Sequence, residues 1–172
     1  ICLNGVFNRP GVYEVPMGTP LTTVLHQLGG GFRVPVKALH IGGPLGGIVP
    51  KALFDRLTID FESFRDAGFL LGHGSILGIP DSFPMIRYLE HLMEFCAAES
   101  CGKCFPCRIG STRGREMLAA AAAGRAPVNR ALLEDLLETL ALTSLCAHGG
   151  GIPLPIRNAL EHFQGELQPY LR

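Results

Sequence analysis

Three cysteines lie within seven residues, and this spacing is the strongest constraint on how the chain can fold. Cys101, Cys104 and Cys107 are each separated by two residues. Disulfides among them are awkward at this spacing, and the N-terminal residues do not have the pattern of a secretory signal peptide, so we expect a reducing compartment. Closely spaced thiols in such a compartment are typical metal ligands. We therefore predict that this segment folds around a metal centre, with a further ligand from elsewhere in the chain.

The candidate for the fourth ligand is Cys146, which lies 39 positions after Cys107. Zinc sites usually take their cysteines as two separated CxxC pairs, whereas here three candidate ligands are close together and the fourth is remote. This arrangement suits a cubane iron–sulfur cluster, in which each thiolate binds a different iron. We predict a [4Fe-4S] cluster held by Cys101, Cys104, Cys107 and Cys146; zinc, or a structural or redox role of the thiols, remains the alternative.

Basic residues surround the predicted site. Lys103, Arg108, Arg113 and Arg115 lie in or just after the cysteine triplet, and the segment after Cys107 has the pattern of a helix. Positive charge and the amide groups at a helix N-terminus both stabilise an anionic cluster and raise its reduction potential. For each arginine the alternative interpretation is an ordinary solvated helix face.

The remaining thiols and the histidines have plainer interpretations. Cys2 and Cys96 are interpreted as small apolar residues. His148 follows the fourth predicted ligand by two positions, so it could donate a hydrogen bond to a cluster sulfur or bind metal itself. The other five histidines are interpreted as surface or core residues.

No pattern indicates acid–base or nucleophilic catalysis by this chain. Ser100 and Ser144 flank predicted ligands, but no histidine or aspartate is spaced to activate either hydroxyl. Asp60 and Glu62 form a close acidic pair that we interpret as a solvated face. We therefore predict no catalytic residue.

Composition excludes two classes of function. The 15 basic and 15 acidic side chains balance, and nucleic-acid binding needs a basic excess, so nucleic acid is not an expected partner. The longest apolar stretches are far shorter than the roughly 20 residues of a membrane helix, so direct membrane insertion is not expected. We predict a cytoplasmic protein.

Residues 1–84 have the pattern of a small α/β domain. A short helix is expected to end at Leu28, with Thr19 or Thr22 as its cap, because apolar residues recur at helical spacing up to that point. Four strands are predicted, at residues 2–6, 11–15, 34–41 and 74–79.

Residues 85–172 change to helical periodicity. The cysteine triplet falls between the first two predicted helices and Cys146 follows the third, so an up-and-down bundle would bring both segments to the same end. The fourth helix is expected to start with Pro155 in its first position. The predicted helices cover residues 85–98, 108–123, 129–140 and 155–163.

The cysteine segments resemble those of a known family. Residues 99–110 (Glu99-Ser100-Cys101-Gly102-Lys103-Cys104-Phe105-Pro106-Cys107-Arg108-Ile109-Gly110) resemble the cluster loop of the NADH- and FMN-binding flavoprotein subunit of the complex I family. Residues 144–150 resemble the segment that supplies the fourth ligand there. Gly5 and residues 9–13, 18–21 and 41–44 resemble the soluble-ligand-binding β-grasp domain that precedes the cluster domain. The run of residues 108–114 and the glycines after Cys146 are more similar to NAD-dependent formate dehydrogenases and NAD-reducing hydrogenases.

The resemblance implies an α+β chain, with a β-grasp (ubiquitin-like) domain at residues 1–84 and a four-helix [4Fe-4S] domain at residues 85–172. It also implies an electron relay in which the cluster carries single electrons between FMN and a partner subunit, in particular a neighbouring iron–sulfur subunit. A formate dehydrogenase is the expected parent enzyme. The alternatives are an NADH:quinone oxidoreductase (complex I), an NAD-reducing hydrogenase and, in another class, a non-enzymatic interaction module with structural zinc.

The glycine-rich segments do not supply a nucleotide site. Residues 42–47 lack the GxGxxG pattern because Pro44 replaces the second glycine, and residues 72–77 lack its last glycine. In the family FMN and NAD bind to a preceding domain, so we expect neither cofactor on this chain. We expect the chain alone to be inactive.

Overall fold

The computed structural model describes residues 1–172, which form two compact units, Ile1–Ser82 and Phe83–Arg172. The first unit contains a mixed β-sheet with short helices. The second is helical except for an isolated β-bridge between Val128 and Leu171. The α+β class predicted from the sequence is confirmed at this level. No helix of the chain has both the length and the apolar composition needed to span a membrane.

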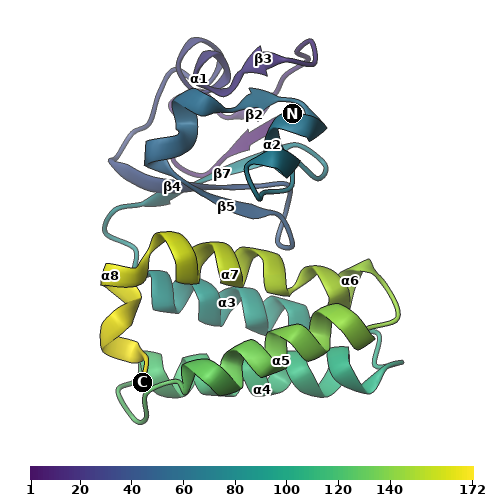
Figure 1. Cartoon of the computed structure of the whole chain (residues 1–172). Helices are drawn as coiled ribbons and strands as arrows, with labels where there is room; N and C mark the ends of the chain where they lie inside the picture. Colours follow the sequence, from purple (N-terminus) through teal and green to yellow (C-terminus); the bar gives the residue numbers. More distant parts are fainter. The chain divides into compact units, whose positions relative to one another are not determined.

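The first unit is built on a five-stranded sheet with the order β2-β1-β7-β4-β5 (Figure 1). Strand β2, at one edge, is antiparallel to β1, and β4 is antiparallel to both of its neighbours, β5 and β7. Strands β1 and β7, the first and last in the sequence, are parallel neighbours. The strands are β1 (Cys2–Asn4), β2 (Gly11–Val12), β4 (Val36–Ile41), β5 (Gly47–Pro50) and β7 (Ser75–Pro80). A separate pair consists of β3 (Thr19–Pro20) and β6 (Thr58–Ile59).

All four predicted strands exist, but the first three are shorter than expected, and β3, β5 and β6 were missed. Strands β3 and β6 have two residues each, too few to show the alternation of apolar and polar residues that marks a strand. Strand β5 directly follows a tight turn in the glycine-rich run, in which the Gly46 N–H donates a 2.8 Å hydrogen bond to the Gly43 carbonyl. Such short strands are defined by their partners in the sheet and not by local sequence pattern.

The short helical segment near Leu28 has a different start from the predicted one. Helix α1 (Leu21–Thr23) continues into a π-helical turn, η1 (Val24–Leu28), and its N-cap is Pro20 without a side-chain hydrogen bond. The prediction that Thr19 or Thr22 caps this helix is therefore wrong. The Thr19 hydroxyl donates instead to the Pro16 carbonyl at 2.7 Å, since it lies in the preceding turn.

The acidic pair of the first unit has a structural role. Asp60 is the N-cap of α2 (Phe61–Asp66) and accepts a 2.6 Å hydrogen bond from the Ser63 N–H. A second hydrogen bond, from the Thr58 hydroxyl, contributes most to lowering the pKa of Asp60. Only Glu62 matches the solvated face predicted for both residues. The unit also has a 3₁₀ turn, η2 (Lys51–Arg56).

Apolar side chains from the sheet and from α1, η1 and α2 form one core. Its fully buried members include Leu3, Phe7, Leu21, Leu25, Leu39, Ile41, Phe64 and Ile76.

The second unit contains three long helices and a series of shorter ones. Helix α3 has the predicted bounds, and Asn129 caps α5 through a 3.1 Å hydrogen bond from the Leu132 N–H. The predicted fourth helix begins at Pro153, not Pro155, and is preceded by a further short helix. The bounds are α3 (Met85–Ala98), α4 (Phe105–Ala122), α5 (Arg130–Thr143), α6 (Ala147–Gly151), α7 (Pro153–His162), α8 (Gln164–Leu167) and the 3₁₀ turn η3 (Gln168–Tyr170).

Helix α4 packs against both α3 and α5, and α5 packs in turn against α7 (Figure 1). Two glycines of α4 allow this close approach. A Cβ built on Gly110 would lie 3.0 Å from the Leu140 side chain of α5, and one on Gly114 would lie 2.7 Å from Met93 of α3. Helical spacing of leucines predicts an apolar face for α5 that includes Leu132, Leu133 and Leu140. Leu133 and Leu140 are buried as predicted, whereas Leu132 is 55% exposed.

Candidate metal centre

The cysteine triplet lies at the N-terminus of α4. Cys101 is exposed in the preceding loop, Cys104 is the N-cap of the helix, and Cys107 is buried in its first turn. The helix begins at Phe105 and not at the predicted position 108, so Cys107 is a helical residue. Pro106 allows this early start, because the first turn of a helix does not use its N–H groups internally. Three thiols are thus presented around one helix end.

Cys146 lies at the same end of the helical unit. It is exposed and is the N-cap of α6, directly after the C-terminal end of α5. Since α5 packs against α4 and α6 contacts both, the loop after α3 and the loop after α5 adjoin (Figure 1). The chain therefore brings the two cysteine segments together, as the predicted bundle requires.

The second cysteine segment affects the thiol of Cys104 in the first. The backbone N–H of Leu145 is the main reason that the pKa of this thiol is lowered. The backbone N–H of Cys107 lowers it further. Both contacts favour the thiolate, which is the form that binds a metal.

Cys107 lies against Gly149 of α6, the second point at which the segments meet. A Cβ built on Gly149 would lie 2.9 Å from Cys107 Cβ and would overlap the Ser144 side chain. The absence of a side chain at position 149 therefore lets α6 approach the buried cysteine. This contact was not read from the sequence, where Gly149 appeared only as part of the segment resembling the fourth-ligand loop.

The residues present fit an iron–sulfur cluster. The donor set is four thiols on adjoining segments, and the Ser144 Oγ is buried next to Cys107 with no hydrogen-bond partner. An all-cysteine donor set is the one that [4Fe-4S] clusters take.

Two neighbouring side chains have roles other than ligation. Cys96 is buried in α3, and burial, helped by the charge of Cys107, raises the pKa of its thiol to about 12. His148 Nε2 lies 3.0 Å from the Cys96 carbonyl oxygen. Because a carbonyl oxygen can only accept, this nitrogen carries the hydrogen. The hydrogen bond links His148 of α6 to the last turn of α3. The expected hydrogen bond from His148 to a sulfur is not the contact that this nitrogen makes.

The predicted basic residues divide into two groups. Arg108 folds back over the cysteine loop, where it donates to the Gly102 carbonyl at 3.1 Å and stacks 4.8 Å above the Phe105 ring. Arg113 and Arg115 pair instead with Glu116 and Glu94 on exposed helix faces, as their alternative interpretation held. Lys103 is exposed within the loop. Of the three arginines, Arg108 is thus the one whose side chain contacts the loop.

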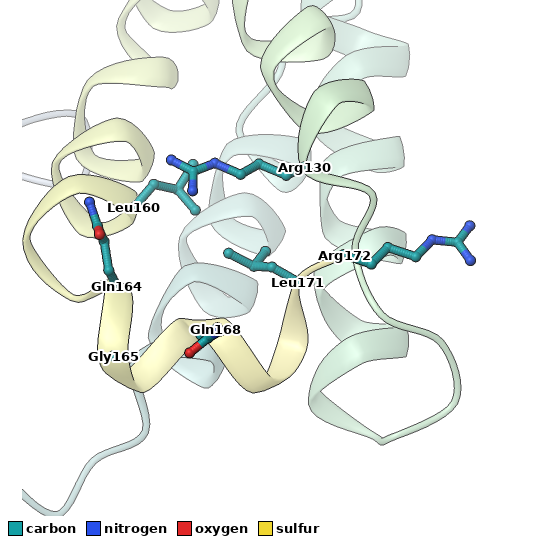
Figure 2. A pocket seen from close by; sticks show the side chains of 7 residues that line it. All are labelled: Arg130, Leu160, Gln164, Gly165, Gln168, Leu171 and Arg172. Carbon is teal, nitrogen blue, oxygen red and sulfur yellow. The ribbon is translucent and has the colours of Figure 1, made fainter.

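A hollow of about 570 Å³ lies at the opposite end of the helical unit (Figure 2). It is formed beside the start of α5, and the side chain of Arg130 extends over it toward Leu160 and Gln164, whereas Arg172 points away. It contains none of the predicted ligands. This hollow is therefore not part of the candidate metal centre.

Comparison with known proteins agrees with this site. Residues 87–170 match the family described as the NADH-ubiquinone oxidoreductase-F iron-sulfur binding region. The chain is 34% identical over 174 residues to an NADH-quinone oxidoreductase subunit of Rhizobium meliloti (strain 1021), covering 99% of the chain and 41% of that protein. It is also 34% identical to the NADP-reducing hydrogenase subunit HndC of Solidesulfovibrio fructosivorans, covering 98% of the chain and 35% of that protein.

A solved structure shares the fold. One chain in the crystal structure of an NAD⁺-reducing [NiFe]-hydrogenase in the H₂-reduced state superposes with a TM-score of 0.85 at 28% identity, over 99% of the present chain and 29% of the matched one. The chain thus spans about two fifths or less of the length of these relatives. It belongs with the NADH-binding flavoprotein subunits of the complex I and hydrogenase family, corresponds to their C-terminal part, and carries their iron–sulfur binding region at residues 87–170.

Proposed function

We propose that the helical unit holds a [4Fe-4S] cluster through Cys101, Cys104, Cys107 and Cys146. The observation that carries this proposal is the meeting of the two cysteine segments, where Gly149 of α6 lies directly against the buried Cys107. When bound, the cluster supplies one-electron chemistry. The chain's own part is to hold four thiolates at one helix end, to partly bury them and to surround them with hydrogen-bond donors.

The proposed role is electron relay between FMN and a partner subunit. The relatives are subunits of NADH-quinone oxidoreductases and of NAD(P)-reducing hydrogenases, so we propose that the parent protein is part of a multisubunit NADH-linked oxidoreductase. A neighbouring iron–sulfur subunit is the proposed electron partner. The formate dehydrogenase branch, favoured by residues 108–114, stays a prediction, as do the cytoplasmic location and the absence of FMN and NAD from this chain.

We also propose finer assignments for the two units. In the first, parallel central strands β1 and β7 with a helical segment after the β1–β2 hairpin are consistent with a β-grasp fold, and we assign it as the soluble-ligand-binding domain of residues 1–84. In the second, the helices α3, α4, α5 and α7 support a four-helix bundle at residues 85–172.

Metal analysis of the full chain, purified without oxygen, tests the site. We expect about four irons and four sulfides per chain and an S = 1/2 EPR signal after reduction with dithionite. Cys146→Ser should lower the iron content, whereas Cys2→Ser, a matched change in the other unit, should not. One zinc per chain and no EPR signal after reconstitution with iron and sulfide would favour the structural zinc module instead.

A second measurement tests the relay. NADH added to the purified chain should leave the cluster oxidised, because the proposed route from NADH runs through FMN on a preceding domain. Addition of dithionite to the same sample provides the positive control. Reduction by NADH without any added flavoprotein would contradict the proposed division of labour.

A further inference from the structure

Two serine hydroxyls approach the buried ligand Cys107 from different segments. The Ser100 Oγ lies 3.4 Å from the Cys107 sulfur and also accepts a 3.3 Å hydrogen bond from the Gly102 N–H. The oxygen of Ser100 therefore acts as an acceptor for Gly102, and its hydrogen is left for the sulfur. A metal-bound cysteine is a thiolate and has no hydrogen to give, so Ser100 must be the donor in the loaded site.

The second hydroxyl belongs to Ser144, at the C-terminal end of α5. Its Oγ is buried and has no hydrogen-bond partner among the atoms of the chain. Ser144 and Cys107 Cβ contact the same side of Gly149. An unpaired buried hydroxyl is unfavourable, and the nearby sulfur atoms of a bound cluster are the acceptors that would satisfy it.

We propose that Ser100 and Ser144 donate hydrogen bonds to the Cys107 thiolate and the adjoining cluster sulfur, and thereby raise the reduction potential of the cluster. This inference rests on the proposed function. Reduction adds one electron and one negative charge to the cluster, and no bond to either serine forms or breaks. Hydrogen-bond donors stabilise the more negative state more strongly, so both serines favour the reduced form. They are positioning residues and not ligands.

The test is a redox titration of the full chain, with dithionite as the electron donor and EPR as the readout. At the potential where the unmodified cluster is half reduced, Ser100→Ala and Ser144→Ala should each lower the ratio of reduced to oxidised cluster by up to about tenfold. For a one-electron couple this equals a shift of up to about 59 mV to more negative potential. Combining the two changes should give a larger shift.

Thr143→Val is the matched control. Thr143 precedes Ser144, but its hydroxyl is exposed and donates to the Thr139 carbonyl at 2.6 Å, so the potential should not change. Ser100→Thr keeps a hydroxyl at the first position and should restore the potential that Ser100→Ala loses. A structural effect of the alanine would not be corrected in this way.

Unchanged potentials in both alanine variants, with full iron and sulfide content, would overturn the inference and leave the proposed cluster intact. If Ser144→Ala loses iron, the pair Ser100→Ala and Ser100→Thr decides, because Ser100 lies in a loop and is only partly buried. Equal potentials in that pair would also overturn it. Absence of iron and sulfide from the unmodified chain would instead refute the proposed function.

Discussion

Two adjacent glycines of α6 should respond in opposite ways to alanine. Neither Gly149 nor Gly150 has a left-handed backbone, so the outcome depends on what the new methyl group meets. At position 149 it would overlap the Ser144 hydroxyl and lie 2.6 Å from Ser144 Cβ and 2.9 Å from Cys107 Cβ. At position 150 the nearest atom is the Ala141 carbonyl oxygen, at 3.8 Å.

The magnitudes follow from these contacts. The Cβ atoms of Ser144 and Cys107 are fixed to the backbone and cannot rotate away, so Gly149→Ala should incur an overpacking cost of about 1–3 kcal/mol. Because three atoms lie closer than 3.0 Å to the new methyl group, the cost falls in the upper part of that range. The better helix propensity of alanine offsets about 1 kcal/mol, which leaves a net loss of about 1–2 kcal/mol. Gly150→Ala has the propensity gain alone and should stabilise the unit by up to about 1 kcal/mol.

Urea unfolding followed by far-ultraviolet circular dichroism measures both effects on full chains prepared in the same way. Iron content after anaerobic reconstitution is the second readout, and we expect it to fall in Gly149→Ala because the methyl group pushes α6 away from Cys107. Gly150→Ala should keep its iron. The reasoning is refuted if Gly149→Ala is as stable as the unmodified chain and binds as much iron, since α6 would then not pack closely on Cys107.

Three further outcomes are expected. Asn129→Ala removes the side-chain cap of α5 and should lower the free energy of unfolding by about 1 kcal/mol in urea titrations. Leu137→Ala empties a fully buried core position and should cost about 2–5 kcal/mol, whereas Leu142→Ala, at a position 74% exposed, should change stability by less than about 0.5 kcal/mol; equal losses would contradict the assigned inner face. Burial lowers the pKa of His40 from 6.5 to about 4. As the pH falls, His40 is therefore protonated in the unfolded chain before it is protonated in the folded chain. The free energy of unfolding should therefore fall by about 3 kcal/mol between pH 6.5 and 4, and His40→Leu should lack this part of the pH dependence.

Much of the helical unit was predictable because its signals are local. The apolar spacing of Met85–Ala98 predicted both ends of α3, and Asn129 marked the start of α5 through its capping chemistry. Spacing also singled out the cysteine triplet. The start of α4 was less predictable, since a proline and a cysteine in its first turn, directly after two further cysteines, have no helical pattern.

Less of the first unit could be predicted from the sequence, because its strands depend on contacts between distant parts of the chain. Its parallel pair of β1 and β7 joins residues more than 70 positions apart, and strands of two to four residues carry too little alternation to be read without their partners. The cap at Asp60 was missed for a similar reason, because a carboxylate next to another acid has the same local pattern on a solvated face.

The chemistry that the chain can support follows from residue types and spacing, since four cysteines in this pattern already favour a [4Fe-4S] cluster over zinc. The arrangement of the surroundings of those cysteines follows instead from how the helices pack. The packing of α4, α5 and α6 brings Leu145 to Cys104 and Gly149 to Cys107, and it buries the Ser144 hydroxyl beside them. Such contacts depend on where helices cross, and no local pattern encodes the distance between side chains that lie about 40 residues apart.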